Sequence, residues 1–251
     1  MIDSRRLAYL EALGVDVYVR RGLEPRAEPR AEPAAAPVEA PRAVPESAAV
    51  VVERGPEADL DWEPLREMVA ACTRCTLHET RTQTVFGVGS RSARWMFIGE
   101  APGAEEDRQG EPFVGRAGQL LTSMLRALGF GRDDVYIANV LKCRPPGNRD
   151  PRPEEAAQCR GYLERQIELV APALIVAVGR IAAQNLLATD TALARLRGKV
   201  HALGPRGWPM IVTYHPAYLL RSPGEKRKAW QDLLFARQVY GRIQNGERVL
   251  P

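Results

Sequence analysis

The sequence lacks long apolar runs. None of its 251 residues lies in an unbroken stretch of about 18 apolar residues, the length from which a membrane-spanning helix is inferred. The first residues, MIDSRRLAYLEAL, carry charges where a secretory signal peptide needs its apolar centre. We therefore expect no membrane partner and no export, and we place the protein in the cytoplasm.

Cysteine is also scarce, with four residues in the chain. Because cytoplasmic thiols are kept reduced, a disulfide framework is excluded, and the spacing of the cysteines is better read for metal or redox chemistry. Cys72 and Cys75 form a CxxC pair, and Cys143 and Cys159 follow, so no cysteine is left over. Four thiolates suffice to hold a zinc ion or a 4Fe-4S cluster. Four unrelated buried cysteines and a thioredoxin-like redox pair are the alternatives.

Large apolar residues are almost absent between residues 23 and 56. Prolines there stand at a strict four-residue step, which forbids a helix and a central strand. We therefore expect a disordered Pro/Ala-rich linker at 23–56, preceded by a short helical segment at 1–22. One globular domain at 57–244 and a tail at 245–251 complete the chain. The prolines of the step are Pro25, Pro29, Pro33, Pro37, Pro41 and Pro45.

The body of the chain alternates between two apolar patterns. Short β-rich runs predict buried parallel strands at 95–98, 135–138, 174–178 and 210–213. Helical periodicity predicts helices at 117–128, 153–170, 181–187 and 226–243. The fold class expected is α/β, a three-layer α/β/α sandwich with a central four-stranded parallel sheet. In such folds the ligand site lies beyond the carboxyl ends of the strands.

Charge favours a polyanionic partner. The formal net charge is +4, and residues 195–228 alone hold eight basic residues against one acidic residue, Glu225. A solvated face explains a charge run equally well, so this observation by itself decides little.

The ends of the predicted strands carry the residues with chemistry. Gly99 to Gly103 read GEAPG, and EPFVG follows with Phe113, whose flat ring can stack on a ligand. The second strand ends in Asn139, whose amide offers a donor and an acceptor to a nucleobase edge. The fourth strand leads into His215, which is followed by a proline within the basic segment.

Together these motifs resemble the family 4 uracil-DNA glycosylases, the iron-sulfur branch of the uracil-DNA glycosylase superfamily. The resemblance spans about residues 62–241. It rests on GEAPG, EPFVGRAG, NVLKCRPPGNR, YHPAYLLR and the spacing of the four cysteines taken together. The N-terminal helix and the linker lie outside it.

The resemblance implies a DNA repair enzyme that flips uracil out of DNA and hydrolyses its N-glycosidic bond, leaving an abasic site. It makes Phe113 the stacking wall, Asn139 the reader of the uracil edge, and His215 the donor to uracil O2. Gly99 and Ala101 complete the uracil-binding set. The metal ligands Cys72, Cys75, Cys143 and Cys159 would hold a 4Fe-4S cluster, with Zn²⁺ as the weaker alternative.

One position departs from the best-known branch of the superfamily, where an aspartate of this loop orients the attacking water. Here Ala101 stands at that position, and its methyl group cannot activate water. The catalytic carboxylate is then Glu100, ranked first, or Glu106. The residues expected to contact DNA are Tyr218, Leu219, Arg221 and Lys199, with Tyr218 or Leu219 filling the gap left by the flipped nucleotide.

The partners expected are single- and double-stranded DNA containing uracil. We expect the protein to be a monomer and to be associated with the nucleoid. A protein partner could bind through the N-terminal helix. We expect no strand-cleaving lyase step, because no lysine stands where it could form a Schiff base with the sugar. The alternative function is a non-catalytic, metal-containing module that binds nucleic acid, which Ala101 keeps open.

Overall fold

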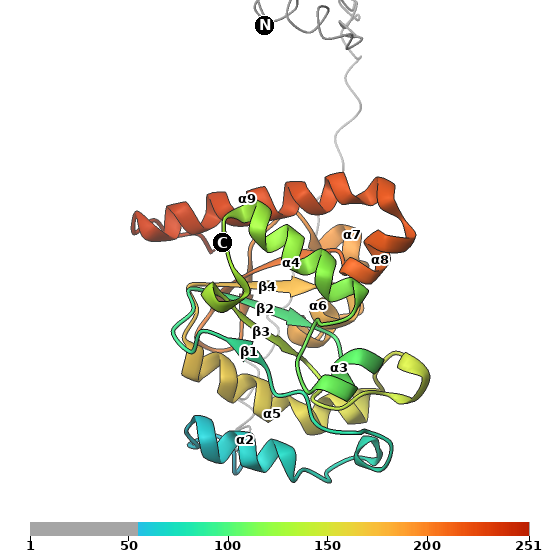
Figure 1. The fold of residues 1–251 in the computed structure, drawn as a ribbon. Coiled ribbons are helices and arrows are strands. Elements are labelled where there is room, and N and C mark those ends of the chain that lie inside the picture. The colour runs from blue at the N-terminus through green and yellow to red at the C-terminus, as the bar shows by residue number, and fades with distance from the viewer. Residues whose placement is uncertain (1–54, 251) are drawn as a thin grey trace, which may run out of the picture. The chain divides into compact units, whose positions relative to one another are not determined.

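The structure is a computed structural model that describes residues 55–250. The segments expected as an N-terminal helix and a Pro/Ala-rich linker lie outside the described residues, apart from the last two residues of the linker. The described part contains a six-stranded sheet with helices on both faces (Figure 1). None of its helices combines the length and the apolar character needed to cross a membrane.

Four parallel strands form the centre of the sheet, as the sequence predicts. They are β2 (Trp95–Gly99), β3 (Tyr136–Asn139), β4 (Leu174–Val178) and β6 (Trp208–Thr213), and each is an apolar run whose central residues are inaccessible to solvent. The order across the sheet is β1-β3-β2-β4-β6-β5. Because the four central strands are parallel, their carboxyl ends meet at one edge.

The predicted central four-stranded parallel sheet is confirmed, and two short strands that were not predicted extend it at its edges. β1 (Val88–Gly89) adds to β3 and β5 (His201–Leu203) adds to β6, both antiparallel. These strands have two and three residues, too few for an alternation of apolar and polar positions to stand out.

Helices cover both faces of the sheet, which confirms the three-layer sandwich. The strand side chains alternate between the faces, so Met96 and Ile98 pack on one side and Trp95 and Phe97 on the other. The first face is covered by α5 (Pro153–Val170) and α6 (Arg180–Leu187), with α2 (Trp62–Ala70) packed on α5. The second face is covered by α4 (Arg116–Leu128) and α9 (Lys226–Gln244), drawn above the sheet in Figure 1.

The four long helices expected from periodicity are therefore present within a residue or two of their predicted ends. Shorter helices lie near the strand ends: α3 (Ala104–Gln109), α7 (Leu193–Leu196) and α8 (Pro216–Arg221). Single 3-10 turns complete the described chain, at Thr76–Glu79, Arg132–Asp134, Pro146–Asn148 and Pro223–Glu225.

Candidate active site

The ends of β2 and β3 hold the first two site residues side by side. Gly99 pairs with Asn139 in the parallel ladder. The pairing continues past the strands, because Val140 N donates to Gly99 O over 3.0 Å and Leu141 N donates to Glu100 O over 3.0 Å. Glu100 and Asn139 are thus fixed at the same edge of the sheet by backbone hydrogen bonds.

Gly99 leaves room for two neighbours. A Cβ atom added to it would lie 2.5 Å from Asn139 Oδ1 and 2.5 Å from the Phe113 ring. Any other residue would displace one of these side chains. Gly99 therefore acts beneath the site, by allowing the asparagine and the aromatic ring to approach the strand end.

The loop that carries Phe113 is strained and held from several sides. Phe113 is 6% exposed and has a φ of +55°, a backbone conformation that costs energy for a residue with a side chain. Arg132 donates to the carbonyl oxygens of Pro112 and Phe113 over 2.8 and 3.1 Å. Such strain, maintained by specific contacts, is typical of a position that serves a ligand.

Glu106 holds the same loop. Its Oε1 accepts hydrogen bonds from Val114 N and Gly115 N, both over 2.9 Å. The next carboxylate, Asp107, is likewise occupied, by the amide and hydroxyl of Thr82. Among the carboxylates of residues 100–107, Glu100 is the one whose side-chain oxygens take part in no hydrogen bond within residues 55–250.

Asn139 is buried, with 2% of its surface exposed. Its backbone oxygen accepts from Lys142 Nζ over 2.9 Å. Its side-chain amide has no hydrogen-bond partner in the described part of the chain. The residue lines a cavity at the strand end, so an amide without a protein partner there is accessible to an incoming ligand.

His215 caps α8 with its own ring. Its Nδ1 accepts from Ala217 N over 3.1 Å, so the ring proton of the neutral imidazole resides on Nε2. Burial, with a smaller contribution from Arg221, lowers the pKa of His215 to about 4. The ring lies 5.7 Å from that of Phe113, centroid to centroid. At neutral pH it is therefore an uncharged donor beside the aromatic wall.

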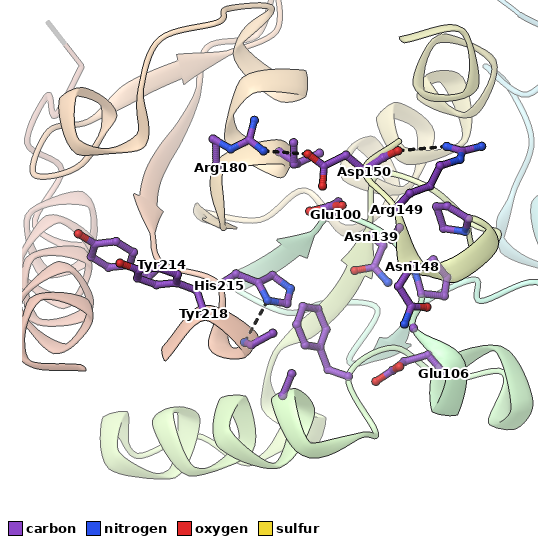
Figure 2. Close-up of a pocket in the computed structure, with 18 of the residues that line it drawn as sticks. Glu100, Glu106, Asn139, Asn148, Arg149, Asp150, Arg180, Tyr214, His215 and Tyr218 are labelled. Atoms are coloured by element: carbon purple, nitrogen blue, oxygen red, sulfur yellow. Dashed lines mark hydrogen bonds and ion pairs between the residues drawn. The ribbon is translucent and has the colours of Figure 1, made fainter. Parts of the chain in front are cut away.

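Glu100 has a shifted pKa. Burial and, second, the charge of Asp150 raise the pKa of Glu100 to about 7, against the opposing effect of Arg180. Arg180 and Asp150 form an ion pair with an N–O distance of 2.8 Å, visible in Figure 2. A carboxyl group with a pKa near 7 can take up a proton at physiological pH, as a general base must.

These groups line one cavity of about 700 Å³. Figure 2 shows Glu100, Asn139 and His215 around its inner end and Tyr214 and Tyr218 to one side. The residues expected from the sequence that the structure brings together are Glu100, Ala101, Glu106, Phe113, Asn139, His215, Tyr218 and Arg221.

Two residues expected to contact DNA do not line this cavity. Leu219 is 1% exposed, whereas its neighbours Tyr218 and Leu220 are both 37% exposed. In this structure Leu219 is therefore turned inward on α8, and the exposed apolar side chain beside it is Leu220. Lys199 is exposed but lies outside the cavity lining.

The lining also contains residues that sequence reasoning missed, among them Tyr214, Asp150 and Arg180. Tyr214 could have been found, because it directly precedes His215 after the fourth strand. Asp150 and Arg180 come together from positions 30 residues apart, and no local pattern marks them as a pair.

Comparison with known proteins agrees with this geometry. The family model of the uracil DNA glycosylase superfamily matches residues 86–234. A type-4 uracil-DNA glycosylase of Archaeoglobus fulgidus is 47% identical over 182 residues, which cover 70% of this chain and 92% of that protein. The type-4 enzyme of Thermotoga maritima is 49% identical over 162 residues, covering 64% of this chain and 83% of that protein. The chain belongs to the type-4 uracil-DNA glycosylases.

A related branch matches less well. A type-5 uracil-DNA glycosylase of Pyrobaculum aerophilum is 36% identical over 149 residues, which cover 52% of this chain and 64% of that protein. The type-4 matches are both more similar and longer.

In this type-4 uracil-DNA glycosylase the four cysteines surround a second, small cavity. Cys72, Cys75, Cys143 and Cys159 all line it. Arg81 Nη1 donates to Cys143 Sγ over 3.0 Å, and Lys142 N donates to Cys159 Sγ over 3.4 Å. Hydrogen bonds to sulfur are one means by which proteins stabilise cysteine-bound clusters.

Lys142 lines the cysteine cavity and is hydrogen-bonded to Asn139, which lines the active-site cavity. Its side chain is 1% exposed, and Nζ donates to Asn139 O, Phe86 O and Gln166 Oε1 over 2.9, 3.3 and 2.6 Å. A fully buried lysine is rare, and this one has three neutral acceptors. Sequence reasoning missed it because nothing local distinguishes it from an exposed lysine.

Proposed function

We propose that this type-4 uracil-DNA glycosylase removes uracil from DNA by hydrolysis of the N-glycosidic bond, with its strand-end residues as the catalytic and binding groups. The observation that carries the proposal is the convergence, in one cavity, of an amide that has no hydrogen-bond partner within residues 55–250, an aromatic wall, a neutral histidine and a carboxyl group of raised pKa.

Asn139 and Phe113 read the base. The ring of Phe113 stacks on the flipped uracil, and the amide of Asn139 accepts from N3–H and donates to O4. Cytosine presents an amino group where uracil has O4, which leaves the amide donor without an acceptor. An unpaired buried donor costs about 1 to 3 kcal/mol, and this cost favours uracil over cytosine.

His215 stabilises the leaving group. As the bond between C1′ and N1 breaks, N1 keeps the electron pair and negative charge spreads to O2. Nε2–H of His215 donates to that oxygen, an interaction that strengthens as the charge develops. A pKa of about 4 keeps the ring neutral across the physiological range.

Glu100 acts on the attacking water. The water oxygen bonds to C1′ and the carboxylate receives its proton, which completes the hydrolysis. Glu100 is preferred to Glu106 because the Glu106 oxygen already accepts two backbone hydrogen bonds of the Phe113 loop. We assign Glu106 to positioning that loop. Ala101 lines the cavity without taking part in the chemistry.

The cavity rim contacts the DNA strand. Arg221 and Lys199 are exposed cations suited to phosphates, and Tyr218 and Leu220 are exposed at the end of α8. Phosphate contacts place the strand without reading its sequence.

The cysteine cavity is the proposed site of a 4Fe-4S cluster, which supplies structural cross-linking between the segment after α2, the loop after β3 and α5. A single zinc ion needs its four sulfurs at about 2.3 Å from one point. Within residues 55–250 no three Cys, His, Asp or Glu side chains are arranged to hold one ion. The four thiols around a shared space fit a cluster better.

No lyase step is proposed. Lys142 is the lysine of the NVLKCRPPGNR motif, and its amino group is buried among three acceptors. It therefore cannot reach a sugar carbon in the cavity to form a Schiff base.

Incubation with a single-stranded oligonucleotide containing one uracil tests the proposal. We expect free uracil to be released, and strand cleavage to follow only after alkali. The matching cytosine oligonucleotide should remain intact. Binding without release of uracil would instead support a non-catalytic module, and cleavage without alkali would contradict the absence of a lyase step.

A further inference from the structure

The active-site cavity is large enough to hold more than the groups assigned to uracil. Pockets of about 300 to 1,000 Å³ hold ligands of drug size, and this one has about 700 Å³. Phe113, Asn139 and His215 belong to its lining, and so do Tyr214, Tyr218 and Arg221. In Figure 2, Tyr214 and Tyr218 lie on the side of His215 that faces away from Asn139.

The two tyrosines at that side form a stack. The rings of Tyr214 and Tyr218 lie 5.3 Å apart, centroid to centroid, at an interplanar angle of 15°. Tyr214 is half-buried, whereas Tyr218 is 37% exposed. An exposed ring supported by a second ring offers a flat and rigid surface to a ligand.

The inner ring of the stack is fixed by a buried ion pair. The Arg197 guanidinium lies 4.2 Å from the Tyr214 ring centroid and donates to its hydroxyl over 3.1 Å. Asp232 accepts two hydrogen bonds from Arg197, over 2.7 and 2.9 Å, and a third from Thr213. The arginine side chain is 14% exposed and the aspartate 5%. The platform is therefore held in place before any DNA binds.

We propose that the Tyr214–Tyr218 stack is a subsite for the nucleobase directly beside the uracil in the same strand. This inference rests on the proposed function. Stacking of a base on an aromatic ring tolerates every base, because each has a π face. Arg221 stands three residues after Tyr218 on α8, is exposed, and has no ion pair within the described residues, so it can meet the adjoining phosphate.

This role differs from filling the gap in a duplex. A gap-filling side chain acts only where a complementary strand has lost its partner. A stacking platform acts on single-stranded DNA as well, and it binds a base that stays in the strand. Tyr218 then contributes to every substrate whose neighbouring base is present.

Removal of single bases tests the proposal. Single-stranded oligonucleotides carry one uracil and a tetrahydrofuran spacer in place of the nucleotide on its 5′ or its 3′ side. For the wild-type enzyme, one of these spacers should lower kcat/KM about tenfold. On the parent oligonucleotide, kcat/KM of Tyr218→Ala should be about tenfold below that of the wild type. For this variant the spacer should cause no further decrease in kcat/KM. Tyr218→Phe, which keeps the ring, should behave as wild type.

Trp230→Ala is the matched control, since Trp230 is an aromatic side chain with 36% exposure that does not line the cavity. It should leave the spacer effect unchanged. The proposal is overturned if neither spacer affects the wild type, or if Tyr218→Ala keeps the spacer effect. It is also overturned if Tyr218→Ala is impaired on duplex DNA alone. Failure of the wild type to release uracil from the parent oligonucleotide would instead refute the proposed function.

Discussion

The active-site cavity and the cysteine cavity differ in whether the polar side chains that line them are hydrogen-bonded to the protein. At the strand ends, the amide of Asn139 and the carboxyl of Glu100 have no hydrogen-bond partner within the described residues. At the cysteine cavity, the sulfurs of Cys143 and Cys159 accept hydrogen bonds from Arg81 and from the Lys142 backbone. This difference fits the proposed roles, in which the first region binds the substrate and the second has a structural function.

The two regions share one short stretch of chain. Asn139 ends β3, and Lys142 and Cys143 follow within four residues. The Lys142 side chain donates to the carbonyl of Asn139, the proposed reader of uracil, while its backbone amide donates to a cysteine sulfur. We therefore expect that loss of order at the cysteine cavity would disturb the position of Asn139.

The largest effect is expected for His215→Ala. This change removes a donor that acts mainly in the transition state, so kcat should fall about 100- to 1,000-fold while DNA affinity changes little. Single-turnover release of uracil and a separate binding titration measure the two quantities. His201→Ala, at a histidine outside the cavity lining, is the control. Equal loss of affinity and turnover would show that His215 binds DNA instead.

The next largest effect is expected in the pH dependence of kcat/KM, which tests the role of Glu100 as the general base. Its pKa of about 7 means that protonation below pH 7 removes the base, so kcat/KM should fall about tenfold per pH unit there. Glu100→Gln should lower activity and flatten this acid limb. Because the pKa of Glu100 is raised from 4.5 to about 7 in the folded state, its contribution to stability is lost between about pH 4.5 and pH 7, and Glu100→Gln should remove that loss. An unchanged acid limb in Glu100→Gln would assign the base elsewhere.

Lys142→Met should remove the hydrogen bond between the Lys142 side chain and Asn139, which joins the cysteine cavity to the active-site cavity. It leaves the acceptors at Gln166 and Asn139 without their donor, which should lower the free energy of unfolding by about 1 to 3 kcal/mol. Denaturant unfolding measures this change, with the exposed Lys199→Met as control. If Lys142→Met were as stable as the wild type and released uracil at the same rate, the hydrogen bond between Lys142 and Asn139 would have no function.

The smallest effect is expected at the rim. Arg221→Ala should weaken binding of uracil-containing and ordinary DNA alike, and reduce the slope of log K against log salt by about 1. Fluorescence anisotropy at several salt concentrations measures both. A change in base preference instead would place Arg221 among the reading groups.

The sequence was a good guide to the central strands, the long helices and the inner cavity. Buried parallel strands appear as continuous apolar runs, and the residues at their ends must meet at one edge. The inward position of Leu219 was not foreseen, because no helix was predicted from the sequence at residues 216–221. They form α8, whose helical spacing turns Leu219 inward and leaves Tyr218 and Leu220 outside. The roles of Lys142 and Arg197 depend on contacts between distant segments, which local patterns do not record.

A crystal structure of the His215→Ala variant with a single-stranded uracil oligonucleotide tests the central claim most directly. We expect uracil stacked on the Phe113 ring, with the Asn139 amide within hydrogen-bond distance of N3 and O4. We also expect a 4Fe-4S cluster in the cysteine cavity. Uracil bound elsewhere, or an Asn139 amide turned away from it, would contradict the account.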